Sequence, residues 1–281
     1  MRQRKFIQCD VFTAVPTKGN GLAVIVDADG LTDDQMQDFA AWTNLAETTF
    51  LLPPTEASAD YKARIFTPVQ EMPFAGHPTL GSCASWLHTG GTPKQEGIVR
   101  QECGVGIVDI DMTRKVPAFV APPTTIEPLQ QEQILAICDA LDINSASIVR
   151  TAKLDNGPVW QAFELASAKD VLAVDSSKVR WPAFKSIGLI GPHAEGSECD
   201  YEVRSLAPSS GMSEDPITGS LNSAIACWMY DQGRLQSNLV VAQGTNINRQ
   251  GRIFIDPDPN EAGRILIGGE TQILIEGIVT L

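Results

Sequence analysis

Short runs of apolar and β-branched residues alternate with turn-forming residues along the chain, and these runs predict strands. FIQCDVFT and GLAVIVDA follow one another near the start, with PTKGNG between them as a tight turn. ETTFLLPP is stopped by its two prolines, and YKARIFTP comes next. GRIFID, GRILIGG and TQILIEGIVTL close the chain. The pattern therefore places strands in both halves of the sequence.

Two segments have the periodicity of helices at the periphery of a domain. LTDDQMQDFAAWTN contains Thr32 followed three residues later by Gln35, which is the spacing of a capping box. One side of this helix is apolar and is formed by Leu31, Met36, Phe39 and Ala40. LQQEQILAICDALDI predicts another helix near the middle of the chain.

Two further predicted helices carry almost no charge. HPTLGSCASWLHTGG has no charged residue from Pro78 through Leu87, and PITGSLNSAIACWMYDQG has the same character. A helix that is apolar or small on every side is a buried helix. Each half of the chain is therefore expected to combine several strands with one peripheral and one buried helix.

The segments that lead into the two buried helices are copies of each other. Five residues return 140 positions later, because Asp60, Tyr61, Arg64, Pro68 and Met72 match Asp200, Tyr201, Arg204, Pro208 and Met212. After a slip of two residues, Pro78, Gly81, Ser82 and Ser85 match Pro216, Gly219, Ser220 and Ser223. The repeat predicts an α+β protein of two similar lobes, residues 1–117 and 118–281, each a curled sheet around its own central helix. The last strand could also pair back into the first lobe.

Composition narrows the classes of partner. The chain has 281 residues, of which 43% are hydrophobic and 20% charged, and its net charge is -13. This balance argues against a nucleic-acid groove or an anionic membrane surface, since both require clustered Lys and Arg. A small anionic substrate stays compatible with it, because backbone N–H groups can hold an anion without basic side chains.

Cysteine spacing argues against a structural metal. No pair among the six cysteines has CxxC spacing, and only three histidines accompany them, so buried free thiols are expected instead of a zinc cluster. The first residues lack the apolar region of a signal peptide, and no apolar run reaches the length of a transmembrane helix. These features favour a cytoplasmic protein.

The starts of the two buried helices are candidate binding elements. The first N–H groups of a helix lack intrahelical partners, so two such starts facing one another could grip a carboxylate. His77 and Asp215, which differ between the copies, lie where chemistry could be done on the bound molecule. Each also has a structural interpretation, because Asp215 could cap its helix and His77 could be a helix cap or a structural histidine. The repeat favours site membership for both.

A general acid/base is also required, and Glu47 is the leading candidate. It heads the otherwise uncharged segment ETTFLLPP, and apolar neighbours would raise the pKa of its carboxyl towards neutrality. Glu71 and Glu214 are rivals, but both fall in predicted polar loops where a solvated position is the plainer explanation. Spacing alone leaves the choice open.

Several motifs resemble those of the PhzF-like family, the isomerases related to the phenazine-biosynthesis enzyme, within the wider diaminopimelate epimerase fold. The matching pieces are DVFTAVPTKGNGLAVIVDADGL, NLAETTF, RIFTPVQEMPFAGHPTLG, SEDPITGS and IGGETQILIEGIVTL. They run from the first strand to the last, so the resemblance covers essentially the whole chain.

The resemblance implies two β-barrel-like lobes around central helices, with the active site between them, and catalysis without metal or organic cofactor. It implies that Glu47 shuttles a proton while His77 and Asp215 line the site. It also implies a homodimer. The substrate-binding residues carried over from the motifs are Asn20, Gly76, Thr218, Gly219 and Ser220.

The chain departs from the family pattern in a few places. GNG replaces the usual GNP turn, NLAET replaces NLSET, and Asn222 stands where a histidine is common. The relatives with epimerase activity use one cysteine per lobe, whereas Cys83 has Leu221 at its matching place, which argues against two-thiol racemisation. None of the departures removes a named catalytic group, so they concern the substrate.

The sequence therefore predicts a cofactor-independent isomerase that moves a proton on a small carboxylic acid, with Glu47 as general acid/base. One alternative is an amino- or hydroxy-acid epimerase or racemase, which would need Asp215 as an opposed second base. Another is a non-catalytic protein that binds a metabolite in the same place.

Overall fold

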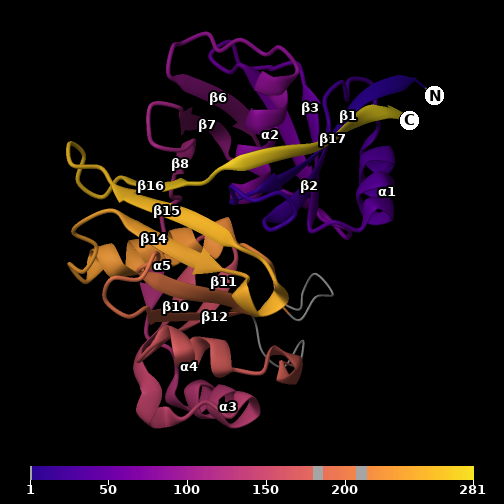
Figure 1. Ribbon diagram of the computed structural model, residues 1–281. Helices are drawn as coiled ribbons and strands as arrows, with labels where there is room; N and C mark the ends of the chain where they lie inside the picture. Colours follow the sequence, from indigo (N-terminus) through magenta and orange to yellow (C-terminus); the bar gives the residue numbers. More distant parts are fainter. Residues whose placement is uncertain (1, 180–185, 207–213) are drawn as a thin grey trace. The chain divides into compact units, whose positions relative to one another are not determined.

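A computed structural model describes residues 2–179, 186–206 and 214–281 (Figure 1). The chain divides into two compact units. Unit 1 comprises Met1–Val120 together with Gly268–Leu281, and unit 2 comprises Ala121–Ile267. The last strand, whose return to the first lobe the sequence left open, belongs to unit 1.

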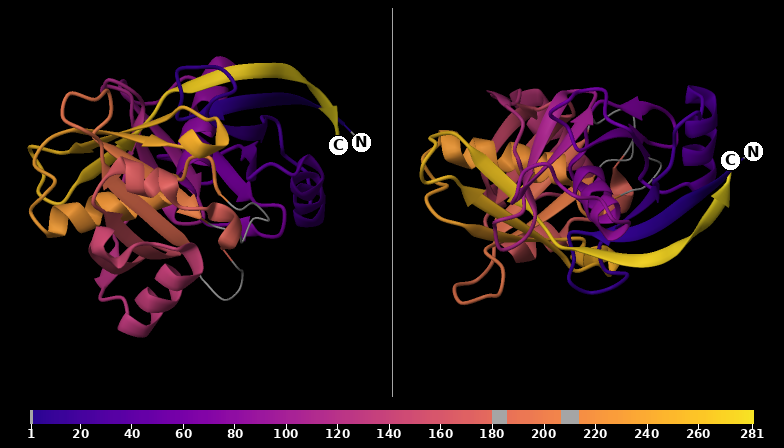
Figure 2. Two further views of the ribbon diagram at one scale, coloured as in Figure 1. Left: turned by 60° about the horizontal axis from the view of Figure 1, so that its bottom comes forward. Right: turned by 90° about the horizontal axis from the view of Figure 1, so that it is seen from above.

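Unit 1 is built on one sheet whose neighbouring strands follow the order β17-β1-β2-β3-β4-β6-β7-β8. The short β5 adds to β4. β1 and β17 pair antiparallel from Gln3 with Thr280 to Val11 with Thr271, and both views of Figure 2 show them side by side. The strands are β1 (Gln3–Val11), β2 (Asn20–Ile25), β3 (Glu47–Leu52), β4 (Tyr61–Phe66), β5 (Glu71–Met72), β6 (Ile98–Cys103), β7 (Gly106–Asp111), β8 (Ala118–Val120) and β17 (Thr271–Thr280).

Two helices complete unit 1. α1 (Asp33–Thr43) begins with the predicted capping box, because the Thr32 side chain accepts from the Gln35 backbone and the Gln35 side chain accepts from the Thr32 backbone. Its buried residues Met36, Phe39 and Ala40 join the cluster that contains Phe50 and Phe66. α2 (Gly76–His88) is the central helix and contacts β1, β2, β3, β4, β6, β8 and β17.

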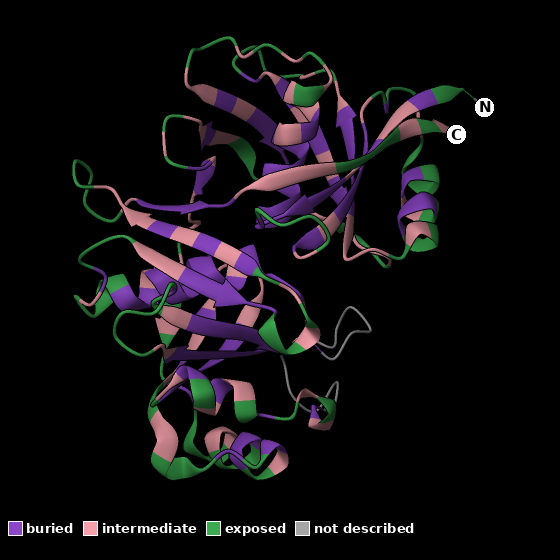
Figure 3. Ribbon diagram, in the orientation of Figure 1, coloured by how far each residue is buried: buried purple, intermediate pink, exposed green. Residues whose placement is uncertain are grey.

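Unit 2 repeats this arrangement. Its strands are β9 (Thr125–Glu127), β10 (Ile148–Asp155), β11 (Val159–Leu165), β12 (Ile187–Pro192), β13 (Tyr201–Leu206), β14 (Leu239–Gln243), β15 (Gly251–Pro257) and, at the unit boundary, β16 (Ile265–Gly268). Its helices are α3 (Gln131–Leu141), α4 (Ala168–Ala173), the central α5 (Gly219–Asp231) and the 3₁₀ turns η1 (Ser145–Ser147), η2 (Ser176–Lys178) and η4 (Thr245–Ile247). Both central helices are buried along most of their length (Figure 3).

The two units share one sequence of strand pairings. From β1 to β7 the pairs run antiparallel, parallel, antiparallel, parallel and antiparallel. From β10 to β15 they run in the same order. β17 flanks β1 antiparallel in the same way that β9 flanks β10. The fold is therefore α+β, with two similar lobes, each a β-barrel-like sheet around a central helix.

The repeated aspartates have one structural role. The Asp60 carboxylate accepts from the Arg100 backbone N–H at 2.8 Å, and the Asp200 carboxylate accepts from the Val240 backbone N–H at 2.7 Å. The Asp60 and Asp200 N–H groups donate in return to the carbonyl groups of Arg100 and Val240. Each aspartate thus joins two neighbouring strands at their starts. Pro208 and Met212, two other members of the sequence repeat, lie outside the described residues.

The structure gives the central helices a different register from the sequence match of Gly81 with Gly219. Both helices have 13 residues, so Gly76 corresponds to Gly219 and the displacement is 143. Thr79 Oγ1 donates to the Ala75 carbonyl as Asn222 Nδ2 donates to the Thr218 carbonyl, which fits the same displacement. The paired sequence matches Pro78–Pro216, Gly81–Gly219, Ser82–Ser220 and Ser85–Ser223 are therefore wrong. His77 corresponds to Ser220, and Asp215 corresponds to Met72.

Close approach of each central helix to its sheet depends on a glycine. A Cβ on Gly81 of α2 would lie 2.5 Å from Leu22 Cδ2 in β2. In unit 2 the roles are exchanged, because a Cβ on Gly188 of β12 would lie 2.5 Å from Leu221 Cδ1 in α5. A missing side chain on one partner therefore lets a leucine of the other fill the space.

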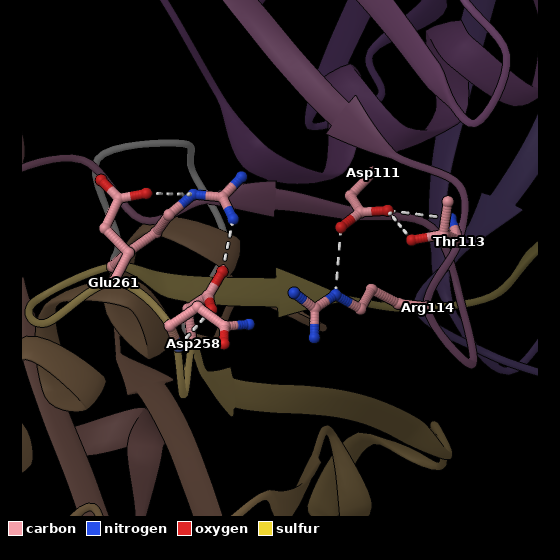
Figure 4. A network of polar contacts seen from close by, with 7 residues as sticks. Asp111, Thr113, Arg114, Asp258 and Glu261 are labelled. Carbon is pink, nitrogen blue, oxygen red and sulfur yellow. Dashed lines mark hydrogen bonds and ion pairs between the residues drawn. The ribbon is translucent and has the colours of Figure 1, made fainter.

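Short turns after equivalent strands are held by aspartates. After β7, Asp111 accepts from the Thr113 hydroxyl and from Arg114 Nε (Figure 4). After β15, Asp258 accepts from Arg264 Nη1 at 2.6 Å, within the second group of contacts in Figure 4.

All six cysteines lie in described segments and are free, with five buried and Cys227 partly exposed. The expectation of free thiols is confirmed. Burial raises the pKa of Cys9 and of Cys83 to about 12, so both are protonated and unreactive at neutral pH. Among the described residues, no helix combines the length and apolar character needed to span a bilayer.

Candidate active site

Glu47 and His77 are brought together in unit 1. Glu47 is the first residue of β3, and His77 is the second residue of α2. Glu47 Oε2 lies 3.2 Å from His77 Nε2. The His77 side chain is 6% exposed and the Glu47 side chain 19% exposed, so solvent reaches part of the Glu47 side chain but hardly the ring. The two residues form a carboxylate–imidazole pair at the start of a buried helix.

Burial determines the charge of this histidine. Loss of hydration lowers the pKa of His77 from 6.5 to about 3. An ionised Glu47 beside the ring would raise the pKa, but burial of the ring is the larger influence, so His77 is neutral at pH 7. The contact lacks the geometry of a formed hydrogen bond despite its distance.

The start of α2 offers backbone donors. Ala75 is the N-cap residue and supplies no capping side chain, and the first turn contains no acidic residue. Gly76 and His77 therefore stand in the part of the helix whose N–H groups lack intrahelical acceptors. Because this helix start is buried and carries the positive end of the helix dipole, it suits a carboxylate or another anion.

Asn20 lies at the same edge of the sheet as Glu47. It is the first residue of β2, which runs parallel to β3 with Leu22 opposite Glu47. Asn20 is 2% exposed. The preceding Gly19 N–H donates to Asp10 Oδ2 at 2.9 Å and holds the turn against β1. The structure thus places the predicted residues Asn20, Glu47, Gly76 and His77 on neighbouring elements of unit 1.

The predicted residues of unit 2 gather at the start of α5. Thr218 is the N-cap residue but makes no capping hydrogen bond with its side chain, and Gly219 and Ser220 open the helix. Instead, the Thr218 hydroxyl donates to Asp215 Oδ2. Asp215 is half-buried, and its backbone N–H donates to the Ser205 carbonyl at 2.9 Å. The Asp215 side chain therefore accepts a hydrogen bond from the hydroxyl of the cap residue.

Two polar residues at this helix start escaped prediction. Asn156 Nδ2 donates to the Ser220 carbonyl at 2.8 Å. Gln243, the last residue of β14, is fully buried and contacts Thr218 and Asn222. The sequence offered one indication of the role of Gln243, which ends the apolar run LVVAQ. A buried strand seldom ends in an amide that lacks a hydrogen-bond partner.

The rival glutamates are structural. Glu71 is exposed and forms a two-bond ion pair with Arg64. The prediction of a solvated position is wrong for Glu214, which is 3% exposed and forms the equivalent two-bond pair with Arg204. The partners are seven positions apart in unit 1 and ten positions apart in unit 2. Because the spacing differs, the sequence repeat did not reveal that Glu214 is the equivalent of Glu71.

Within the described ranges, no three His, Cys, Asp or Glu side chains are grouped in a way that could hold a metal ion.

Comparison with known proteins identifies relatives along the whole chain. The family model described as phenazine biosynthesis-like protein matches residues 9–277. Antisense-enhancing sequence 1 of Schizosaccharomyces pombe is 33% identical over 299 residues, which cover 99% of each protein. Trans-2,3-dihydro-3-hydroxyanthranilate isomerase of Pseudomonas chlororaphis is 28% identical over 288 residues, covering 98% of this chain and 99% of the relative.

Solved structures show the same fold. A PhzF-family protein from Bacillus anthracis superposes with a TM-score of 0.84 at 21% identity, with all of both chains covered. A hydroxyproline epimerase from Agrobacterium vitis superposes with a TM-score of 0.65 at 12% identity, covering 99% of this chain and 92% of the other. Sequence and fold agree, and the chain belongs to the PhzF-like family as an isomerase of the PhzF-like type.

Proposed function

We propose that this protein is a cofactor-independent isomerase that moves a proton on a small carboxylic acid, with Glu47 as the general acid/base. The observation that carries the proposal is the contact between Glu47 and the buried, neutral His77. A carboxylate that is partly exposed on one side and meets an imidazole on the other can both reach a substrate and be oriented.

The proposed reaction has two proton transfers. The Glu47 carboxylate accepts a proton from a carbon next to an activating group, and the resulting acid returns it to a different carbon. His77 remains neutral throughout, because its pKa of about 3 keeps imidazolium out of reach. In the tautomer that carries its proton on Nε2, the Nε2–H can donate to an oxygen of Glu47 in both forms, because the acid form keeps an acceptor oxygen. His77 can therefore hold Glu47 in both protonation states.

The carboxylate of the substrate is assigned to helix-start N–H groups. In unit 1 these belong to Gly76 and His77, and in unit 2 to Gly219 and Ser220. His77 and Asp215 are proposed to assist proton transfer or position polar substituents. The curated relative from Pseudomonas chlororaphis is named for trans-2,3-dihydro-3-hydroxyanthranilate, which is a carboxylic acid, so this compound heads the panel of candidate substrates.

Glu47→Gln tests the assignment. The amide is nearly isosteric with the carboxyl but cannot accept the proton, and loss of a general acid/base lowers rates by about 10²–10⁴-fold. We expect turnover of the panel to fall at least this far while the thermal unfolding midpoint stays close to that of the wild type. Glu71→Gln is the matched control, because Glu71 is an exposed glutamate of the same unit and should leave turnover unchanged. Wild-type turnover in Glu47→Gln would refute the role of Glu47.

Cofactor independence and a homodimer are further parts of the proposal. The rate should persist after exhaustive dialysis against a chelator, and a rate restored only by adding a metal ion or organic cofactor would contradict the first part. Sedimentation velocity at micromolar concentration should give the mass of two chains, whereas a single 30.3 kDa species would contradict the second.

A further inference from the structure

Gln243 is a fully buried amide in unit 2 that makes four hydrogen bonds at the start of α5. Its Oε1 accepts from the Thr218 backbone N–H at 3.1 Å and from Asn222 Nδ2 at 2.8 Å. Its Nε2 donates to Thr218 Oγ1 at 3.0 Å and to the Asp215 carbonyl at 3.3 Å. The amide therefore touches both ends of the segment Asp215–Thr218.

The orientation of this amide follows from its fixed partners. A backbone N–H can only donate, so the atom that faces Thr218 N must be the oxygen of Gln243. A backbone carbonyl can only accept, so the atom that faces Asp215 O must be the nitrogen. Asn222 is fixed in the same way, because its Nδ2 also donates to the Thr218 carbonyl at 2.9 Å. Rotating the Gln243 amide by half a turn would place donor against donor at the Thr218 N–H, and rotating the Asn222 amide would place acceptor against acceptor at the Thr218 carbonyl.

This orientation sets the direction of the Thr218 hydroxyl. Oγ1 accepts a hydrogen bond from Gln243 Nε2, so the single hydroxyl proton is available for Asp215 Oδ2, which lies within hydrogen-bond distance. An ionised carboxylate can only accept, which completes a chain with one consistent direction. The chain runs from Gln243 through Thr218 to Asp215.

We infer that Gln243 is a positioning residue, which acts through the Thr218 hydroxyl to hold the Asp215 carboxylate in one orientation. This inference rests on the proposed function, in which Asp215 faces the substrate, and deepens it. A hydrogen bond to a charged group is stronger than one between neutral groups. The hydrogen bonds from Gln243 through Thr218 therefore restrict the Asp215 side chain, which would otherwise rotate. Asn222, the departure from the histidine common in the family, contributes by fixing the Gln243 oxygen.

Side-chain NMR tests the chain without any substrate. Asp215 Cγ is observed in protein carrying ¹³C-labelled aspartate, with Asp215→Asn to assign the signal, and the Gln243 amide protons are observed with ¹⁵N. In Thr218→Val, which removes the hydroxyl with little change of shape, we expect the Asp215 Cγ signal to move and one Gln243 amide proton to shift upfield. Thr218→Ser restores a hydroxyl and should bring both signals back towards their wild-type positions.

Gln243→Met separates positioning from packing. It should move the Asp215 Cγ signal in the same direction as Thr218→Val, and the double variant should move it no further. Gln101→Met is the matched control, because buried Gln101 also donates to a threonine of a central helix, Thr79, at 3.0 Å. The control loses a buried amide in unit 1 and should leave the Asp215 signal in place.

Measurements of kcat on the same variants are the second test. Thr218→Val and Gln243→Met should each lower kcat by about 10- to 100-fold, the size expected for a hydrogen bond to a charged group, and their effects should not multiply in the double variant. An unmoved Asp215 signal in folded Thr218→Val, or independent effects of the two changes, would overturn the inference. A moved signal without any turnover by the wild type would keep the chain of hydrogen bonds and reject the proposed function.

Discussion

At the scale of single residues, the charge of His77 is the feature that most shapes the proposed chemistry. A helix start with its positive dipole end and a buried ring both disfavour imidazolium. The carboxylate beside it thus meets a neutral partner that can donate or accept. Such a partner can donate to both the carboxylate and the acid form of Glu47 without adding a buried positive charge, which suits a group that must be base and acid in one cycle.

The same pKa makes stability depend on pH. The unfolded chain binds a proton on His77 near pH 6.5, whereas the folded chain binds it only near pH 3. Between these values the unfolded state holds more protons, so the stabilisation is complete above pH 6.5 and is lost as the pH falls towards 3. We expect the free energy of unfolding to fall by up to about 1.4 kcal/mol per pH unit from this residue.

Urea unfolding of wild type and His77→Asn between about pH 6.5 and 5 measures that slope above the ordinary range of carboxyl titration. The other histidines contribute equally to both proteins, so the difference in slope belongs to His77. Parallel slopes would show that the ring is not held neutral by the fold.

Prediction from sequence worked for residues whose surroundings are visible in the chain. Glu47 heads an uncharged run, and His77 opens an uncharged helix, so each was conspicuous. Gln243 was not, because its importance comes from facing Thr218, and that contact joins residues 25 positions apart. The burial of Glu214 was not predicted, because nothing in its polar sequence neighbours indicates that Arg204 pairs with it.

At the scale of elements, the turn GNG positions Asn20 at the start of β2. A Cβ on Gly19 would lie 2.4 Å from the Val11 carbonyl oxygen, a backbone atom that cannot move aside. A Cβ on Gly21 would meet only Leu45 Cδ2, at 3.8 Å. The first glycine is required by close approach, whereas the second, which departs from the GNP pattern, has room for a side chain.

Gly19→Ala and Gly21→Ala form a matched pair within this turn. We expect Gly19→Ala to lower the free energy of unfolding by about 1–3 kcal/mol or more, as in other overpacked sites. Gly21→Ala should be neutral or stabilising by up to about 1 kcal/mol, because alanine loses less backbone entropy in a strand. Urea midpoints give both values, and equal effects would contradict the close approach at position 19.

Helix existence was predictable, but one helix start was not. The capping box of α1 is a local signal and gave the correct N-terminus. For α5, the proline of EDPITGS suggested a start near Pro216, whereas the helix begins at Gly219. The bonds among Asp215, Thr218 and Gln243 hold this segment outside the helix, and such long-range contacts have no sequence pattern.

At the scale of the whole molecule, the repeat places one Arg–Glu pair in two environments. The side chains of Arg204 and Glu214 are 1% and 0% exposed, and Arg204 also donates to the Val171 carbonyl at 3.0 Å. The side chains of Arg64 and Glu71 are 20% and 43% exposed. The same geometry therefore occurs once in the interior and once near solvent.

Removing the carboxylate should be costly in only one copy. Glu214→Gln leaves Arg204 as a buried charge without its counter-ion and should lower the free energy of unfolding by about 3–5 kcal/mol. Glu71→Gln leaves Arg64 near water and should cost about 0–1 kcal/mol. Denaturant unfolding of the two variants measures the difference, and similar costs would show that burial does not separate the pairs.

The architecture of each unit followed from the sequence because repetition and buried-helix composition are visible in one chain. The order of the strands in each sheet could not be predicted from the sequence, since neighbouring strands can be distant in sequence. The register between the two copies could not be predicted either. Short identities such as that between TLGS and ITGS suggest an alignment that differs from the alignment of the two helices.

The central claim is that Glu47 transfers a proton, and NMR in deuterated water tests it most directly. Wild type and Glu47→Gln are each incubated with trans-2,3-dihydro-3-hydroxyanthranilate and other small carboxylic acids. We predict that wild type alone incorporates deuterium at a carbon distinct from the one that loses its proton, as a double bond migrates. Incorporation at the wild-type rate by Glu47→Gln would contradict the claim, and inversion at a single carbon would identify an epimerase instead.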